Sequence, residues 1–214
     1  MIRSKEDYRR YLEADKRALG ITYSRPPLIL GDIWKYERLL RYCEYWCNCK
    51  YNPGNPFSRF YRKALLVYFE RRGIRLHFSI PLNVCDEGLA LAHVGDVIIN
   101  DKAHIGRYTR IHAGVNIGTR AGERGAAPTL GDYCYIGPGA KLFGPVKVGS
   151  GVAIGANAVV THDFPDDVTV AGVPAKIIAD TGTMDREHPL SNAPEEERAA
   201  YLARQAGKKR SAAC

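Results

Sequence analysis

The middle of the chain repeats every six residues. Written in sixes from Ile99, the sequence reads INDKAH, IGRYTR, IHAGVN and IGTR, and after an interruption LGDYCY, IGPGAK, LFGPVK, VGSGVA and IGANAV. Ile, Leu or Val fills the first place of every unit, a small or modest residue fills the fifth, and Gly is frequent in the second. This period fits neither an amphipathic helix, which repeats every ~3.6 residues, nor an alternating strand, which repeats every ~2.

The repeat predicts a mostly β fold, a parallel β-helix in which about three short strands and three turns make one triangular coil. Stacked coils place the first-place aliphatic side chains above one another in the core, and small fifth-place residues leave room at the turns. Frequent Gly agrees with the backbone dihedral angles that tight corners require. A Gly-rich β-sandwich is the alternative, and we disfavour it because chance spacing does not account for so many matching units.

One segment breaks the repeat. Between Thr119 and Leu130 the sequence RAGERGAAPT does not keep the phase of six, and the register resumes at Leu130. We expect a loop over residues 120–129 that protrudes from the coil. Insertions in repeat folds concentrate on the face that carries function, so this loop is a candidate part of a binding site.

The flanks of the repeat have a different character. Residues 1–75 contain three segments with apolar residues at helical spacing, separated by prolines, and the third is expected to end at Gly73. We therefore predict an N-terminal helical region over 1–75, a β-helix domain over 76–178, and a C-terminal extension over 179–214. The extension should hold a short helix and a basic tail that is disordered or bound to a partner.

Charge and hydropathy exclude some classes of function. The net charge of +8 lies mostly outside the repeat and accompanies no recognised nucleic-acid-binding motif, so we expect no nucleic-acid partner. A nucleotide-bearing cofactor or an acidic glycan would suit the same charge. Neither a signal peptide nor a membrane span is recognisable, and we expect a cytoplasmic protein.

The six cysteines give no paired metal-ligand spacing. Cys43, Cys47 and Cys49 form the one cluster, and aromatic residues interleave it. We expect a buried helical face with reduced thiols there, with a metal site as the less favoured alternative.

Five stretches of the repeat region resemble the hexapeptide-repeat acyltransferases, and within them the serine acetyltransferase-like group, which includes enzymes that acetylate sugars and capsular polysaccharides. They are GLALAHVGDVIIN (88–100), RIHAGVNIGT (110–119), IGPGAKLFG (136–144), IGANAVV (154–160) and VAGVPAKII (170–178). The resemblance covers roughly residues 80 to 178. It implies a left-handed β-helix, a homotrimer, and acetyl transfer from acetyl-CoA to a hydroxyl group without a metal.

The catalytic histidine of that group matches His93. Extending the sixes back from Ile99 also places His93 where an aliphatic residue is expected, and a polar residue in a core place needs a reason. An imidazole suits the role of general base toward an alcohol, because its usual pKa is about 6.5. A hydrogen-bonded structural histidine is the alternative. His104 and His112 fall at outward places and are expected to lie on the surface or to line a cleft.

For acetyl-CoA, the resemblance implies a groove between adjacent coils of a trimer. The positions that match it are Gly118, Thr119, Gly137, Pro138, Ala153 and Ala156. Their small size suits a slender pantetheine arm that lies against the backbone. Lys176 is a candidate for the CoA phosphates, with a solvated lysine as the alternative.

The chain also departs from serine acetyltransferases at positions that contact or orient the substrate. Phe78 matches the aspartate that orients the catalytic histidine, Ala92 matches an aspartate that contacts the amine, and Ala126 and Ala127 match a pair that grips the carboxylate. Because a pocket without these charges would bind free serine poorly, we expect a sugar or glycan acceptor, as in polysaccharide biosynthesis. Serine O-acetylation is the first alternative and a non-enzymatic scaffold the second.

The remaining contacts are expected from side chains near the loop and the first coil. Asn83, Arg120 and Arg124 are the candidates for binding the acceptor. The partner that orients His93 stays open at this point, between a main-chain carbonyl and the side chains of Asn83, Asp86 and Asp96.

Overall fold

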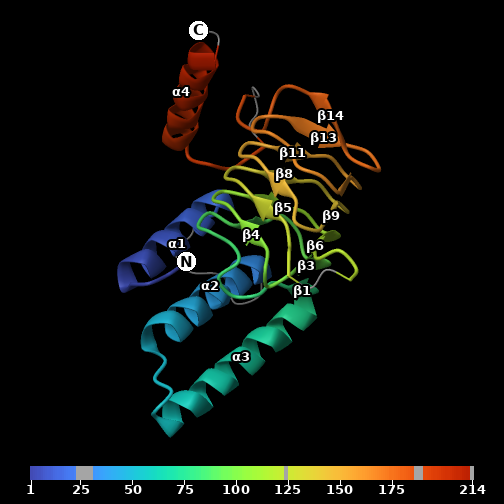
Figure 1. Cartoon of the computed structure of the whole chain (residues 1–214). Helices are drawn as coiled ribbons and strands as arrows, with labels where there is room; N and C mark the ends of the chain where they lie inside the picture. Colours follow the sequence, from blue (N-terminus) through green and yellow to red (C-terminus); the bar gives the residue numbers. More distant parts are fainter. Residues whose placement is uncertain (23–30, 123–124, 186–189, 213–214) are drawn as a thin grey trace.

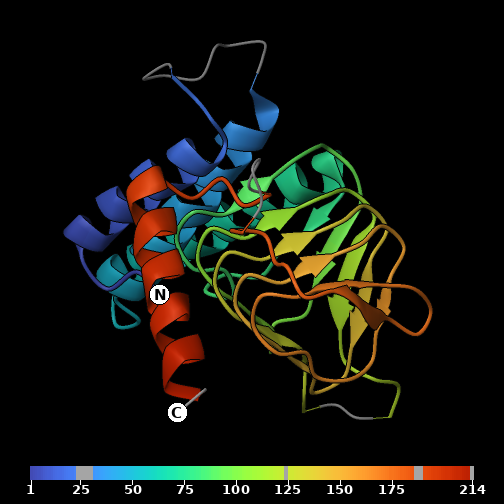
Figure 2. The same ribbon diagram turned by 90° about the horizontal axis from the view of Figure 1, so that it is seen from above.

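A computed structural model describes residues 1–22, 31–122, 125–185 and 190–212. It is a left-handed parallel β-helix with helices packed at one end and a further helix beside it (Figure 1). The predicted fold class is confirmed. Viewed from above, the coil shows its triangular outline, and α1 and α4 lie on the same side of it (Figure 2).

Short strands form the sides of the coil. They are β1 (Phe78–Ser79), β2 (Ala90–Leu91), β3 (Val97–Ile99), β4 (His104–Ile105), β5 (Arg110–Ile111), β6 (Val115–Gly118), β7 (Thr129–Leu130), β8 (Tyr135–Ile136), β9 (Lys141–Phe143), β10 (Lys147–Val148), β11 (Ala153–Ile154), β12 (Val159–Val160), β13 (Thr169–Ala171) and β14 (Lys176–Ala179). Three sheets result, in the orders β1-β3-β6-β9-β12, β10-β7-β4 and β14-β13-β11-β8-β5-β2. Only the pairing of β13 with β14 is antiparallel among the paired strands described.

The first-place aliphatic residues stack as the repeat predicts. Leu91 pairs with Ile111, which pairs with Ile136, which pairs with Ile154, and all four side chains are fully buried. The residues one position earlier point away from this core; Arg110 and Tyr135 are half-buried, while Ala90 and Ala153 are covered by other parts of the chain. This column of aliphatic side chains is the core of the coil, and it fixes which residues of each turn point to the solvent.

The helices begin and end at residues with clear local causes. They are α1 (Lys5–Ala18), α2 (Asp32–Tyr45), the π-helix η1 (Trp46–Lys50), α3 (Pro56–Leu76) and α4 (Glu195–Ala212). The Ser4 side chain caps α1 by accepting from the Asp7 amide at 3.0 Å, and Asn55 caps α3 just before Pro56.

Two expectations about helix ends are wrong. The third helix runs through Gly73 and ends at His77, which adopts the left-handed conformation with φ of 61°. Gly73 serves close packing instead, because a Cβ there would lie 2.6 Å from the Phe78 carbonyl oxygen. The C-terminal helix is also longer than expected, since α4 extends to Ala212 and takes in most of the basic tail.

The cysteine cluster lies where α2 passes into η1. Cys43 is buried, and burial raises the pKa of its thiol to about 12, while Cys47 and Cys49 are half-buried. Among the residues that the structure describes, no three His, Cys, Asp or Glu side chains gather in a way that could hold a metal ion. Likewise, no helix in the described ranges has the length and apolar character needed to cross a bilayer.

A buried charge cluster joins α1 and α2 to the first coil. The guanidinium of Arg41 is fully buried; its Nε donates to Asp15 Oδ2 at 2.7 Å and its Nη1 to Glu44 Oε2 at 3.0 Å. The same guanidinium also donates to the main-chain carbonyls of Cys85 and Asp86, at 2.8 and 2.6 Å. Five donor groups in a fixed planar arrangement allow arginine to serve all these acceptors at once.

Carboxylates of the same helices accept hydrogen bonds from backbone amides of the first coil. Asp15 Oδ1 accepts from the amides of Gly88 and Leu89 at 2.8 and 2.9 Å. Glu44 Oε1 accepts from Asn83 at 2.7 Å, and Glu37 Oε1 accepts from Leu91 at 3.0 Å. Leu91 lies on β2, the last strand of its sheet, so its amide has no further strand to pair with. The helices therefore supply the partners that a preceding coil would supply.

Replacing Arg41 by alanine should lower the free energy of unfolding by about 3–5 kcal/mol, since Asp15 would be left buried without its cation. Arg10→Ala is the matched control, because Arg10 pairs with Glu87 at 2.6 Å but its side chain is 60% exposed. The control should cost under about 1 kcal/mol. Chemical denaturation measures both, and similar losses in the two variants would contradict the role given to the buried cluster.

Glu37 should make stability depend on pH. Burial and the nearby Asp15 raise the pKa of this carboxyl well above its ordinary value, and Oε2 has no partner within the described part of the chain. A raised folded-state pKa contributes stability that is present at low pH and lost as the pH rises through that pKa. Glu37→Gln keeps the acceptor for Leu91 and should flatten the loss. Denaturation midpoints of both proteins across pH test this; parallel curves would refute it.

Candidate active site

One corner of the coil carries two histidines. It lies between the sheet that contains β2 and the sheet that contains β3, and is formed by the stacked turns 92–96, 112–114, 137–139 and 155–157. We call these residues the histidine corner. His93 follows β2 in the first turn, and His112 follows β5 in the second. The core strands on both sides hold the backbone of these turns in register, so the two histidines lie in neighbouring turns.

His93 does not occupy a core place, and the spacing argument for it was wrong. The core place of the first coil belongs to Leu91, which is fully buried and pairs with Ile111. The stretch from Leu91 to Ile99 is two residues longer than one repeat unit, so the corner bulges and His93 lies exposed at its tip. The additional length presents the imidazole to the outside, as a catalytic group requires.

None of the side chains considered as orienting partners contacts His93. Asn83 exchanges hydrogen bonds with Asn48, at 2.7 and 3.3 Å. Asp86 Oδ2 lies 3.3 Å from His104 Nε2, and Asp96 Oδ1 lies 3.0 Å from His77 Nδ1. Asn83, which was also expected to bind the acceptor, is held by Asn48 of η1 through its side chain and by Glu44 of α2 through its backbone amide.

The neighbour of His93 is His112. Their ring centroids lie 5.7 Å apart with planes inclined at 57°, and the His112 ring lies 5.0 Å from that of Tyr135 on its other side. Burial lowers the pKa of His112, and the positive charge of Arg110 and the nearby His93 add to the effect. The ring of His112 is therefore neutral near pH 7. In the sequence, the one sign that His112 could belong to the site was its outward place in the repeat.

The proposed cofactor residues divide between two corners. Gly118 ends β6 and Thr119 follows it, at the corner that comes after the β3 sheet. Gly137, Pro138 and Ala156 lie in the histidine corner, stacked so closely that a Cβ on Gly137 would come within 2.8 Å of the Ala156 amide. Both groups present main chain and small side chains. On a single chain, one group lies where the strands of the β3 sheet begin and the other where they end.

The other two proposed cofactor residues differ in accessibility. Ala153 lies on β11 and is only 2% exposed, so its side chain offers nothing to a ligand in this chain. Lys176 opens β14 at the last coil and is exposed, with its ammonium group available for an anion.

The out-of-phase segment separates β6 from β7, as expected of an insertion. Arg120 is exposed and its guanidinium lies beside Gly144, where an added Cβ would be 3.5 Å from Nη2. Arg124, the second basic candidate in the loop, lies outside the described residues.

Two of the positions at which the chain departs from serine acetyltransferases are buried, namely Phe78, matched to the orienting aspartate, and Ala127, matched to a residue that grips the carboxylate. Phe78 is buried on β1 with its ring centroid 5.0 Å from that of Tyr36, and Ala127 is only 9% exposed. Both side chains belong to the hydrophobic core. A position that points into the core says nothing of the charges that a pocket presents.

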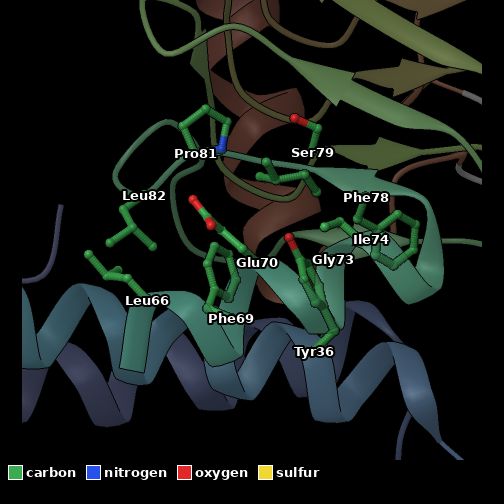
Figure 3. Close-up of a pocket in the computed structure, with 11 residues that line it drawn as sticks. Tyr36, Leu66, Phe69, Glu70, Gly73, Ile74, Phe78, Ser79, Pro81 and Leu82 are labelled. Atoms are coloured by element: carbon green, nitrogen blue, oxygen red, sulfur yellow. The ribbon is translucent and has the colours of Figure 1, made fainter. Parts of the chain in front are cut away.

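A pocket of about 550 Å³ lies elsewhere, between α3 and β1 (Figure 3). Its lining is largely apolar, with Glu70 as its one carboxylate, and includes no histidine. Glu70 is one carboxylate among apolar neighbours, whereas the residue that the resemblance matches to a catalytic histidine is His93, so the histidine corner remains the candidate active site.

Comparisons with known proteins give the chain its relatives. The hexapeptide-repeat family described as "Bacterial transferase hexapeptide (six repeats)" matches residues 127–162. The serine acetyltransferase of Synechococcus elongatus is 35% identical over 121 residues, covering 56% of this chain and 48% of the relative. That of Bacillus subtilis is 34% identical over 132 residues, covering 60% and 59%. The chain thus spans about half the length of the relatives it matches.

Solved structures agree. Serine acetyltransferase from Brucella abortus strain S19, in complex with coenzyme A, is 26% identical with a TM-score of 0.65, over 83% of this chain and 70% of that one. The Neisseria gonorrhoeae enzyme, in complex with serine, is 25% identical with a TM-score of 0.62, over 82% and 71%.

These findings confirm the resemblance to the serine acetyltransferase-like group. They also overturn the expected acceptor. The relatives and solved structures are serine acetyltransferases, so the inference of a sugar or glycan hydroxyl, with a role in polysaccharide biosynthesis, is wrong. That inference rested on the charges missing at Ala92, Ala126 and Ala127.

Proposed function

From the similarity to serine acetyltransferases, we propose that this chain transfers the acetyl group of acetyl-CoA to the hydroxyl of serine. The observation that carries the proposal is the exposed imidazole of His93 at the tip of the first corner, in a fold similar to that of the serine acetyltransferase from Brucella abortus. The imidazole is open to a substrate, and the small residues stacked beneath it leave room for one.

The reaction needs one base and one group of oxyanion donors. A ring nitrogen of His93 accepts the hydroxyl proton of serine as the hydroxyl oxygen attacks the thioester carbonyl. The carbonyl oxygen becomes an oxyanion, which main-chain amides of the Gly-rich turns are suited to stabilise. The tetrahedral intermediate then collapses, the carbon–sulfur bond breaks, and the CoA thiolate leaves and takes up a proton. The transfer requires no covalent enzyme intermediate.

Acetyl-CoA, as co-substrate, would lie along the small residues of the two corners. Gly137, Pro138 and Ala156 would face the pantetheine arm beside His93, and Gly118 and Thr119 would do so from the opposite corner. Lys176 would meet the phosphates, because its ammonium group is exposed. Arg120 is the described loop residue that could contribute to binding the acceptor.

We further propose a homotrimer, in which one chain supplies the first corner of a groove and its neighbour the second. This arrangement brings together the two groups of small residues that one chain keeps apart. Apolar side chains beside the histidine corner support it, since Val94 is 50% exposed and Ile98 46% exposed on a single chain. We place the protein in the cytoplasm, where the free thiols of Cys43, Cys47, Cys49, Cys85 and Cys134 would stay reduced.

Serine should release CoA thiol from acetyl-CoA in the presence of the wild-type chain, and His93→Ala should lower kcat by a factor on the order of a hundred or more. His104→Ala is the matched control, because that imidazole is also exposed but lies on another side of the coil beside Asp86. Thiol detection measures turnover, and circular dichroism checks folding. An active His93→Ala variant, or no turnover of serine by the wild type, would count against the proposal.

Light scattering should give a mass three times that of the 23.8 kDa chain. Ile98→Glu should shift the protein toward monomers, because it places a charge on a surface that the trimer would bury. Activity should fall together with the trimer fraction as the protein is diluted. A monomer with full activity would refute the shared groove.

A further inference from the structure

His112 has a buried ring nitrogen that nothing in the described structure satisfies. Its Nε2 is closed off from solvent and has no hydrogen-bond partner, while its ring contacts His93 on one side and Tyr135 on the other. An unpaired polar atom of this kind costs free energy, so a partner that forms during function is to be expected. We propose that His112 is a positioning residue for His93, whose ring it orients and whose protonated form it stabilises as a hydrogen-bond acceptor.

The stacking of the coils creates the place for this ring. Leu91 pairs with Ile111 and Ile111 with Ile136, so the next residues, Ala92, His112 and Gly137, lie one above another. The neighbours of His112 in this stack are therefore small: Ala92 has only a methyl group and Gly137 has no side chain. These small neighbours leave the His112 ring room to extend toward His93 in the adjacent turn.

No other described side chain competes for the role. The three polar candidates, Asn83, Asp86 and Asp96, pair with Asn48, His104 and His77. The position from which the resemblance led us to expect an orienting aspartate is Phe78, which is buried in the core. Within the described ranges the ring of His112 is the one side-chain ring that His93 contacts.

The charges around His112 favour its acting as an acceptor. Arg110 lies on β5, two residues before His112. His93 and Tyr135 pack against the His112 ring, and Lys141 donates a hydrogen bond to the Gly114 carbonyl in the same turn. Burial of the imidazole, and after it the charges of Arg110 and His93, lower the pKa of His112 and so oppose its protonation. A neutral imidazole keeps one nitrogen without a proton, which can accept from His93.

The proposed hydrogen bond from His93 to His112 forms when serine and acetyl-CoA are bound. With ring centroids 5.7 Å apart the rings are neighbours without a hydrogen bond, and a rotation of the exposed His93 side chain would close the gap. Catalytic hydrogen bonds are commonly long without substrate and tighten when it binds. As His93 takes the proton of serine, its positive charge would be shared with His112, which would make it a stronger base.

The proposal rests on the proposed function, and its first test uses turnover of the full chain. His112→Phe keeps an aromatic ring between His93 and Tyr135 but removes both nitrogens. We expect kcat to fall about tenfold or more with KM for serine and acetyl-CoA little changed, and the acid limb of the kcat/KM profile to move to lower pH. His112→Asn, which restores an acceptor oxygen, should recover part of both.

The second test does not need turnover. With 15N-labelled histidine in the full chain, NMR titration of His93 should give a lower midpoint in His112→Phe than in the wild type. If the midpoint of His93 falls but the wild type does not turn over serine, the role of His112 stands and only the proposed function is rejected. An unchanged titration with an unmoved acid limb would overturn the proposal. A rise in KM for serine at constant kcat would overturn it too, because His112 would then bind the acceptor.

Discussion

The hydrogen bonds between buried acids of α1 and α2 and the amides of the first coil are the constraint on which the rest of the structure depends. A stacked coil satisfies its backbone groups with the coil before and the coil after, and the first coil lacks one of these. Here Asp15, Glu37 and Glu44 accept from its amides, and Arg41 donates to two of its carbonyls. The helical region is thus a cap that replaces a coil.

This cap also positions the candidate active site. Glu37 holds the amide of Leu91, which lies two residues before His93, and Leu91 itself is locked into the core by Ile111. The turn 92–96 that follows is longer than the other turns of this corner, and no complete coil precedes it. Without a fixed start, the path of its backbone would vary. The buried acids are costly to desolvate, and Arg41 offsets that cost by pairing with two of them. Fold stability and the position of the proposed catalytic base therefore rest on the same contacts.

Much of the fold could be predicted from the sequence, because the repeat of six fixes both the strand positions and the direction of each side chain. The columns of Ile, Leu and Val in the core follow from it directly. Long-range contacts could not be predicted. Gly73 is a common kind of helix end in a sequence, yet the approach of the Phe78 carbonyl makes it a packing residue within α3. The six-residue spacing could not show that the first corner is two residues longer either, because no repeat unit before Leu91 sets the register there.

The site was less predictable than the fold. Family resemblance identified His93, while the argument from spacing gave it a core place that belongs to Leu91. The relatives overturn the argument against serine, and one of the positions on which it rested, Ala127, lies in the core, which an alignment does not reveal. His112 was visible only as an outward residue, and its relation to His93 depends on two turns that lie in different coils.

The most direct measurement is a crystal structure of the full chain with CoA and serine bound together. The account predicts serine beside the histidine corner, with its hydroxyl oxygen about 3 Å from a ring nitrogen of His93 and its approach to the CoA sulfur unobstructed. Serine bound with its hydroxyl beyond the reach of His93, or serine held in the pocket between α3 and β1 instead, would contradict it.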